Sequence, residues 1–355
     1  MIPIFDGHND TLTKLYSQRS DNDRSFFIKG DKGHIDLPRA RESGLCGGIF
    51  AIFVPPPKSS KESDLMYGFK LRENGYEVKM RSSLEYQYAK SYTESVIEFL
   101  YNLEIKAKGQ IKIIHKYKEL LQSIKDNILA VILHFEGAEV IKKDLSNLQK
   151  YYNMGLRSLG LVWSRPNIFG VGVPFKFPHT PDTGSGLTDA GKKLVKECNK
   201  LGILIDLAHI NEKGFWDVAK SSTAPLVVSH SGVYSLCHST RNLIDKQIDA
   251  IGESNGIIGI NLEPANIRSD GKMNLDTPLK VIIEHIDYIT QRIGVEHVAF
   301  GSDFDGAKMP NFIKDITGLP NLIKALRNRG YDKESLEKIA YKNWLRVFKK
   351  TWKDI

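Results

Sequence analysis

Eight short apolar runs alternate with amphipathic stretches along most of the chain. The runs fall at residues 2–6, 48–54, 128–135, 158–163, 203–208, 226–229, 256–261 and 298–302. Patterns with helical spacing lie between most of them, at residues 65–107, 145–154, 188–201, 212–220, 244–253 and 279–293. Near-continuously apolar strands that alternate with helices are typical of a parallel sheet covered on both faces. Eight such units predict an α/β fold, a closed (β/α)8 TIM barrel.

The chain length suits one barrel with insertions. It has 355 residues, of which 41% are hydrophobic, so we expect residues 1–355 to form a single domain. Two connections are unusually long, residues 55–110 after the second strand and residues 164–187 after the fourth. The second is rich in Gly, Pro and aromatic residues, as lids and binding loops often are, and it should hang over the carboxyl ends of the strands. Residues 332–352 predict an amphipathic C-terminal helix.

The charge pattern gives no reason to expect a nucleic-acid partner. The net charge is +8, but the lysines are interleaved with acids, as in "KALRNRGYDKESLEKIAYKNW", which is typical of solvated helix faces. No apolar run is long enough for a membrane span, and the N-terminus lacks the features of a signal peptide. Cys46, Cys198 and Cys237 have no CxxC spacing. We therefore expect a cytoplasmic protein with reduced thiols and no membrane contact.

Five short segments end in residues that bind metal ions through nitrogen or oxygen. These residues are His8, Asp10, Glu136, His209, His230 and Asp303. Because the carboxyl ends of parallel barrel strands meet at one face, the side chains should converge there. Neutral imidazole and carboxylate groups are ligands that suit Zn²⁺. The sequence therefore predicts a metallohydrolase centre.

Three nearby residues leave alternatives open. His134 lies two residues before Glu136 and is a rival ligand, although such a histidine is more often a hydrogen-bonded core residue. Asp305 could be confused with Asp303; we prefer Asp303 because it is nearer the strand end, and we expect Asp305 to support the turn. Asp206, three residues before His209, is a candidate for orienting a ligand.

Arg241 lies in "HSTRN", eleven residues after His230. A guanidinium group offers a planar clamp with two parallel hydrogen bonds for a carboxylate. An arginine at an arbitrary position is usually a surface residue, and only the neighbouring candidate ligands make this one a candidate for binding substrate.

Five motifs together resemble the membrane dipeptidase (renal dipeptidase) family of zinc peptidases. They are "DGHND", "FEG", "GILIDLAH", "SHSGVYSLCHSTRN" and "FGSDFDG", and they run in order across nearly the whole chain. The resemblance implies a (β/α)8 barrel that holds two zinc ions. It also implies hydrolysis of dipeptides with a free C-terminal carboxylate, including those with a C-terminal D-residue, by a homodimeric enzyme.

The resemblance implies a role for each candidate residue. His8, Asp10 and Asp303 would hold one zinc ion, His209 and His230 the other, and Glu136 would bridge the two. A hydroxide between the metal ions would attack the peptide carbonyl, and Asp303 would carry the proton, so Glu136 and Asp303 are the expected catalytic residues. Arg241 would bind the carboxylate of the dipeptide.

Trp163 stands where mammalian members of the family place a substrate-contacting histidine, so we expect it to contact the substrate although it departs from the family pattern. Tryptophan has a single N–H donor and cannot carry a positive charge. Together with Phe169, Phe175 and Phe177, it motivates an alternative, a binuclear zinc amidohydrolase acting on N-acyl amino acids or other small amides. A non-catalytic binding barrel is a third reading, and the presence of all six expected ligands argues against it.

Overall fold

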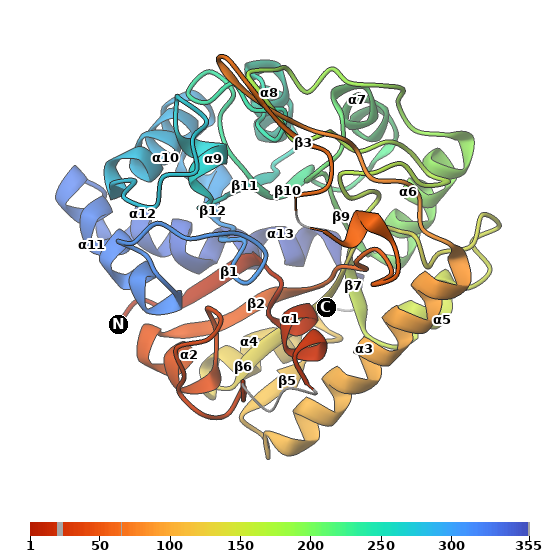
Figure 1. Cartoon of the computed structure of the whole chain (residues 1–355). Coiled ribbons are helices and arrows are strands. Elements are labelled where there is room, and N and C mark those ends of the chain that lie inside the picture. Colours follow the sequence, from red (N-terminus) through yellow and green to blue (C-terminus); the bar gives the residue numbers. More distant parts are fainter. Residues whose placement is uncertain (20–23, 65, 354–355) are drawn as a thin grey trace.

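The computed structural model describes residues 1–19, 24–64 and 66–353. Parallel strands form its centre and helices surround them (Figure 1). The barrel strands, in spatial order, are β1 (Ile4–Asn9), β2 (Leu45–Ile52), β6 (Leu129–Glu136), β7 (Leu156–Gly160), β9 (Leu204–Asp206), β10 (Val227–Ser231), β11 (Ile257–Ile260) and β12 (Val298–Phe300). The ring nearly closes beyond β12, where the Asp303 amide donates to the His8 carbonyl. The predicted (β/α)8 barrel is confirmed.

Each of the eight predicted apolar runs overlaps a barrel strand. Both faces of these strands are buried, which explains why the runs are apolar throughout instead of alternating. The boundaries differ by up to three residues, because hydrogen bonding between strands fixes the ends and apolar composition does not. One short additional strand, β5 (Ile111–Ile113), pairs with β6 outside the barrel order.

A helix follows each barrel strand along the chain. They are α1 (Thr11–Ser17), α2 (Leu37–Ser43), α3 (Tyr86–Lys106), α4 (Tyr117–Lys125), α5 (Leu148–Asn153), α6 (Asp189–Leu201), α7 (Glu212–Ser221), α8 (Asp245–Glu253), α9 (Pro264–Ile267), α10 (Leu279–Ile293), α11 (Leu319–Arg329), α12 (Lys333–Glu337) and α13 (Asn343–Thr351). The Thr188 side chain caps α6 by accepting a hydrogen bond from the Gly191 amide, and Gly202 ends that helix in the left-handed conformation.

The predicted helix at residues 65–107 is wrong in its first half, and residue 65 itself lies outside the described residues. A β-hairpin stands there, β3 (Phe69–Arg72) and β4 (Gly75–Val78), and α3 begins only at Tyr86. The Asn74-Gly75 pair favours a hairpin, a signal that the apolar pattern concealed; Asn74 lies in the turn and Gly75 opens β4. β4 also pairs with β8 (Lys176–Phe177) of the second long insertion. A Cβ atom on Gly75 would lie 1.8 Å from the Phe177 carbonyl oxygen, so this pairing requires glycine.

The C-terminal segment closes the end of the barrel at which the strands begin. Trp344 is fully buried, packs beside Phe5, and donates from Nε1 to the Phe300 carbonyl at 3.0 Å. A Cβ atom on Gly7 would lie 2.1 Å from the Trp344 ring, so glycine lets the ring approach β1. The predicted amphipathic helix is present, but it is divided into α12, a π-helical turn (Lys338–Lys342) and α13. Because this end is filled, the space left for a site is at the other end, where the carboxyl ends of the strands meet.

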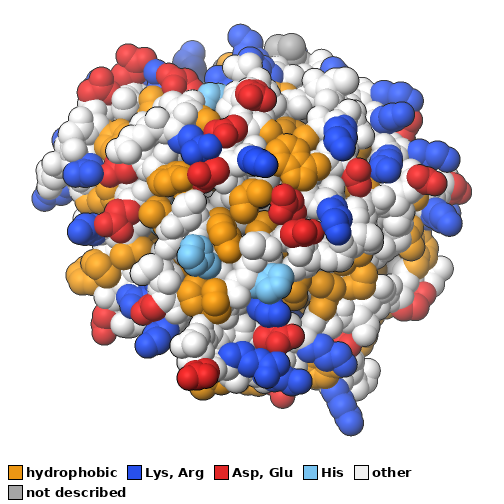
Figure 2. Space-filling view, turned by 90° about the horizontal axis from the view of Figure 1, so that it is seen from above, with side chains coloured by type: hydrophobic (Ala, Val, Ile, Leu, Met, Phe, Trp, Pro, Cys, Tyr) orange, Lys and Arg blue, Asp and Glu red, His pale blue; other side chains and the backbone are white. Residues whose placement is uncertain are grey.

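The surface carries charges of both signs. Figure 2 shows lysine and arginine side chains scattered among acidic ones, with hydrophobic side chains gathered near the centre of that face. Within the described ranges, no helix is long and apolar enough to cross a bilayer.

Candidate active site

The six predicted ligands converge at the carboxyl ends of the barrel strands. Nε2 of His8 lies 3.5 Å from Asp10 Oδ2 and 3.7 Å from Glu136 Oε1. The same Glu136 oxygen lies 2.9 Å from Nε2 of His209 and 3.8 Å from Nε2 of His230. Asp303 forms a further group with His8 and Asp10, in which the potential ligand atoms all lie within 4.8 Å of one another. Glu136 is therefore central to the cluster.

The donor atoms fit a metal ion. Both ring nitrogens of His8 and Oδ1 of Asp10 are buried and have no hydrogen-bond partner among the described residues. Leaving such atoms without partners costs free energy, which a coordinated cation would offset. Imidazole nitrogen and carboxylate oxygen are the donors that zinc takes in hydrolytic sites.

Two serines orient the rings of His209 and His230. The Ser164 hydroxyl lies 2.8 Å from Nδ1 of His209, so Nε2 is directed toward Glu136. Ser229 donates to Asp206 Oδ2 at 2.5 Å and lies 2.8 Å from Nδ1 of His230. A hydroxyl has a single proton, so Nδ1 of His230 must carry the proton of this contact, and Nε2 keeps its lone pair for a metal ion.

The ionisable groups of the cluster have perturbed pKa values. Burial, with the neighbouring Asp10, raises the pKa of Glu136, and burial also raises that of Asp303. Burial, followed by the charge of Arg241, lowers the pKa of His209. Burial lowers the pKa of His8, but the Glu136 and Asp10 carboxylates outweigh it and raise that pKa to about 10. A divalent cation would replace the proton of His8 and would stabilise the mutually repelling carboxylates.

The backbone is strained at two of the candidate ligands. His209 and Asp303 both have a φ of 64°, in the left-handed region that residues other than glycine rarely adopt. Such conformations persist where surrounding structure enforces them, often at functional sites. Here each stands three residues after the end of its strand, β9 or β12, and its side chain joins the cluster.

The neighbouring candidates have other contacts. Asp305 binds Arg24, with Oδ2 2.7 Å from Nη2, and accepts from the Thr11 hydroxyl, so it supports the loop as expected. His134 bonds through Nδ1 to the Ser158 hydroxyl at 2.9 Å. Its Nε2 has no hydrogen-bond partner among the described residues, and with His8 and Asp206 it forms a further group of potential donors deeper in the barrel.

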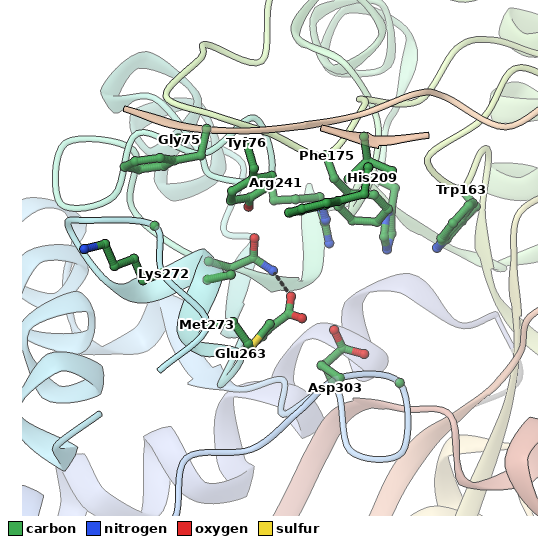
Figure 3. Close-up of a pocket in the computed structure, with 18 of the residues that line it drawn as sticks. Gly75, Tyr76, Trp163, Phe175, His209, Arg241, Glu263, Lys272, Met273 and Asp303 are labelled. Carbon is green, nitrogen blue, oxygen red and sulfur yellow. Dashed lines mark hydrogen bonds between the residues drawn. The ribbon is translucent and has the colours of Figure 1, made fainter. Parts of the chain in front are cut away.

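A cavity of about 1100 Å³ opens above the cluster and contains both predicted substrate-binding residues. Arg241 is almost fully buried. Within the described residues, its guanidinium group donates a hydrogen bond to the His230 carbonyl at 3.3 Å. Trp163 lines another wall of the cavity, and its ring centre lies 4.8 Å from that of Phe53 and 5.6 Å from that of Phe175. Figure 3 shows Trp163 on the side of the cavity away from Lys272.

Sequence reasoning missed two residues of the cavity, Tyr76 and Glu263, and one residue beside it, Asn261. Tyr76 reaches the cavity from β4, with its hydroxyl close to Ser239 and Arg241, and its position depends on the unpredicted hairpin. Asn261 ends the seventh apolar run and Glu263 follows it, much as the candidate ligands follow other runs, and that placement was a usable signal. Asn261 Nδ2 donates to Asp303 Oδ2 at 3.0 Å. Burial, then the charge of Asp303, raises the pKa of Glu263 to about 7.

Comparisons with known proteins agree with this geometry. The model of the family described as membrane dipeptidase (peptidase family M19) matches residues 1–353. A crystal structure of a metallo peptidase from Rhodobacter sphaeroides, liganded with a phosphinate mimic of the dipeptide L-Ala-D-Ala, has a TM-score of 0.93 and 42% identity and covers 99% of both chains. An uncharacterised protein of Klebsiella pneumoniae is 45% identical over 244 residues, 69% of this chain and 90% of its own. Dipeptidase tcpJ of Claviceps purpurea is 27% identical over 351 residues, 97% of this chain and 76% of its own.

Proposed function

Because this chain belongs to the membrane dipeptidase family, peptidase family M19, and is a metallo-dipeptidase, we propose that it uses two zinc ions to hydrolyse dipeptides that have a free C-terminal carboxylate. The observation that carries the proposal is the position of one Glu136 oxygen. It lies within 3.8 Å of ring nitrogens of His8, His209 and His230. A carboxylate surrounded in this way is suited to bridge two cations.

The ligands divide into two sets around Glu136. His8, Asp10 and Asp303 would hold one zinc ion, and His209 and His230 the other. When bound, the zinc ions would polarise the peptide carbonyl and make a water molecule more acidic. Ser164 and Ser229 support the second set, because each fixes the orientation of one histidine ring.

Asp303 would move the proton of the reaction. Its carboxylate would accept a proton from the attacking water and donate it to the nitrogen of the leaving amine. Asn261 supports this role, because its amide nitrogen holds Oδ2 of Asp303 at 3.0 Å and so orients the carboxylate.

Arg241 would bind the C-terminal carboxylate of the dipeptide. Its buried guanidinium makes no ion pair with an acid within the described part of the chain, so its charge is available to a ligand. A C-terminal D-residue is part of the proposal, supported by the phosphinate mimic of L-Ala-D-Ala in the similar Rhodobacter sphaeroides metallo peptidase.

A second candidate is hydrolysis of N-acyl amino acids. The aromatic wall of Phe53, Trp163 and Phe175 favours it, because an apolar acyl group would pack there without needing a partner for an ammonium group. The carboxylate of an N-acyl amino acid would still bind Arg241. The two candidates therefore differ in whether the substrate has a free α-amino group.

The test compares three substrates with zinc-reconstituted enzyme: L-Ala-D-Ala, its C-terminal amide and N-acetyl-D-alanine, with L-Ala-L-Ala alongside. The proposal predicts fast release of alanine from a dipeptide, a loss of about 100-fold in kcat/KM for the amide, and slow hydrolysis of the N-acetyl compound. Faster hydrolysis of N-acetyl-D-alanine than of either dipeptide would establish the second candidate instead.

The homodimer and the cytoplasmic location belong to the same proposal. Analytical ultracentrifugation of the purified chain tests the first, with a single species of twice the 40.1 kDa chain mass as the expected result.

A further inference from the structure

Glu263 is an acidic residue in the substrate cavity that the proposed reaction does not use. It follows β11 and stands at the start of α9. Asn266 Nδ2 donates to its Oε2 at 2.5 Å, and its own amide donates to Asn261 Oδ1 at 2.6 Å. Figure 3 shows the Glu263 carboxylate between Arg241 and Asp303, with a dashed line for the hydrogen bond that it accepts. The residue is therefore held in place, with Oε1 left for a ligand.

The charge of Glu263 has no direct ion-pair partner in the part of the chain that the structure describes. Within the described ranges, no cation lies within 4.0 Å of its carboxylate. The charges of Arg241 and of exposed Lys308 reach Glu263, but neither residue forms an ion pair with it. Arg241 and Glu263 are thus opposite charges that face one cavity without neutralising each other. A ligand that excludes water from both must supply an anion to Arg241 and a cation to Glu263.

The position of Glu263 indicates which part of a dipeptide carries that cation. Arg241 follows β10 and Glu263 follows the adjacent strand β11. The side chain of the C-terminal residue branches from the carbon that bears the carboxylate, so it lies beside Arg241. With the carboxylate on Arg241 and the scissile carbonyl at the cluster, the α-ammonium group would lie beyond the scissile bond, on the side of the cluster away from Arg241. Glu263 is therefore placed to meet the C-terminal side chain.

We propose that Glu263 makes this enzyme selective for dipeptides whose C-terminal residue carries a basic side chain, such as lysine, ornithine or arginine. This inference rests on the proposed function, because it assumes that Arg241 binds the C-terminal carboxylate. A carboxylate that accepts a charge-assisted hydrogen bond from an ammonium or guanidinium group stabilises that substrate. An acidic C-terminal side chain is repelled by the same group.

The experiment uses lysine and norleucine as the C-terminal residue, because the two differ mainly in the ammonium group. The faster of L-Ala-L-Ala and L-Ala-D-Ala first decides the configuration of the second residue. kcat/KM is then measured for L-Ala-Lys and L-Ala-norleucine in that configuration. The wild-type enzyme should prefer lysine by about tenfold or more. In Glu263→Gln, which keeps the oxygen that accepts from Asn266, the ratio should fall to about one.

Glu73→Gln is the matched control. Glu73 is an exposed acid on the β3–β4 turn at the rim of the same cavity. Its replacement therefore reports the effect of removing one negative charge that does not contact the substrate side chain. The lysine-to-norleucine ratio of this variant should stay close to the wild-type ratio. Thermal unfolding confirms that both variants are folded.

Three results would overturn the inference. They are a wild-type ratio near one, a ratio that Glu263→Gln leaves unchanged without loss of activity, and a ratio left unchanged because Glu263→Gln lowers kcat/KM equally for both substrates, which would assign Glu263 to the α-ammonium group. Each of them leaves the proposed function standing, because both dipeptides are still cleaved. Failure to cleave any dipeptide would instead count against the proposed function.

Discussion

The hydroxyl oxygen of Ser229 lies 2.8 Å from Nδ1 of His230, and it donates its proton to Asp206. This contact sets which nitrogen of His230 carries a proton. We predict that Ser229→Ala lowers zinc affinity by about 10–100-fold, because the ring loses both its orientation and its tautomer preference. Competition with a chromophoric chelator measures the affinity.

Ser158→Ala is the control for this variant, since it removes another buried serine that bonds a histidine, His134. It should leave zinc affinity unchanged. An equal loss in both variants would point to His134 as a ligand and would contradict the assignment of His230.

Arg241→Met should reduce kcat/KM for L-Ala-D-Ala by about 100-fold, because the substrate carboxylate loses its charged partner in a buried site. The slow hydrolysis of the C-terminal amide should change far less, since the amide has no carboxylate to lose. Steady-state kinetics with both substrates checks the difference. Equal losses for the two substrates would mean that Arg241 acts on something other than the carboxylate.

Trp163 forms an aromatic wall with Phe53 and Phe175, so its replacement should affect binding more than chemistry. We predict that Trp163→Ala raises KM for dipeptides about tenfold with a smaller change in kcat. Trp163→Phe keeps the wall and removes only the N–H donor, so it should resemble the wild type. A loss of about 100-fold in kcat for Trp163→Phe would instead make that donor part of transition-state stabilisation.

Trp344 fills the end of the barrel opposite the cavity. Trp344→Ala should lower the free energy of unfolding by about 3–5 kcal/mol, because it leaves a large cavity under β1 and β12. Urea unfolding measures the change. Trp216→Ala, at a half-buried position on α7, should cost clearly less, and equal losses would contradict the role given to Trp344.

The sequence predicted most of the barrel because its strands are buried on both faces, which gives each the same apolar signature. The positions of the proposed ligands followed from this, since Glu136, His209 and Asp303 stand where apolar runs end. The hairpin β3–β4 was not predictable in that way. Its side chains are exposed or half-buried, and it is held by pairing with β8, about a hundred residues later in the chain. Tyr76, which depends on that pairing, was missed for the same reason.

The serine contacts of His209 and His230 were also beyond sequence reasoning. Ser164 comes from the loop after β7 and reaches His209 after β9 only because those strands are neighbours in the barrel. Apolar periodicity predicts the strands, but it does not predict which hydroxyl turns toward which ring.

The most direct test of a binuclear zinc dipeptidase is a zinc titration of the metal-free protein, with bound zinc and hydrolysis of L-Ala-D-Ala measured at each point. We predict that zinc binding saturates at two ions per chain and that activity reaches its maximum as the second ion binds, because Glu136 lies between both sets of ligands. Full activity without metal, or a zinc-saturated protein that cleaves no dipeptide, would contradict the account.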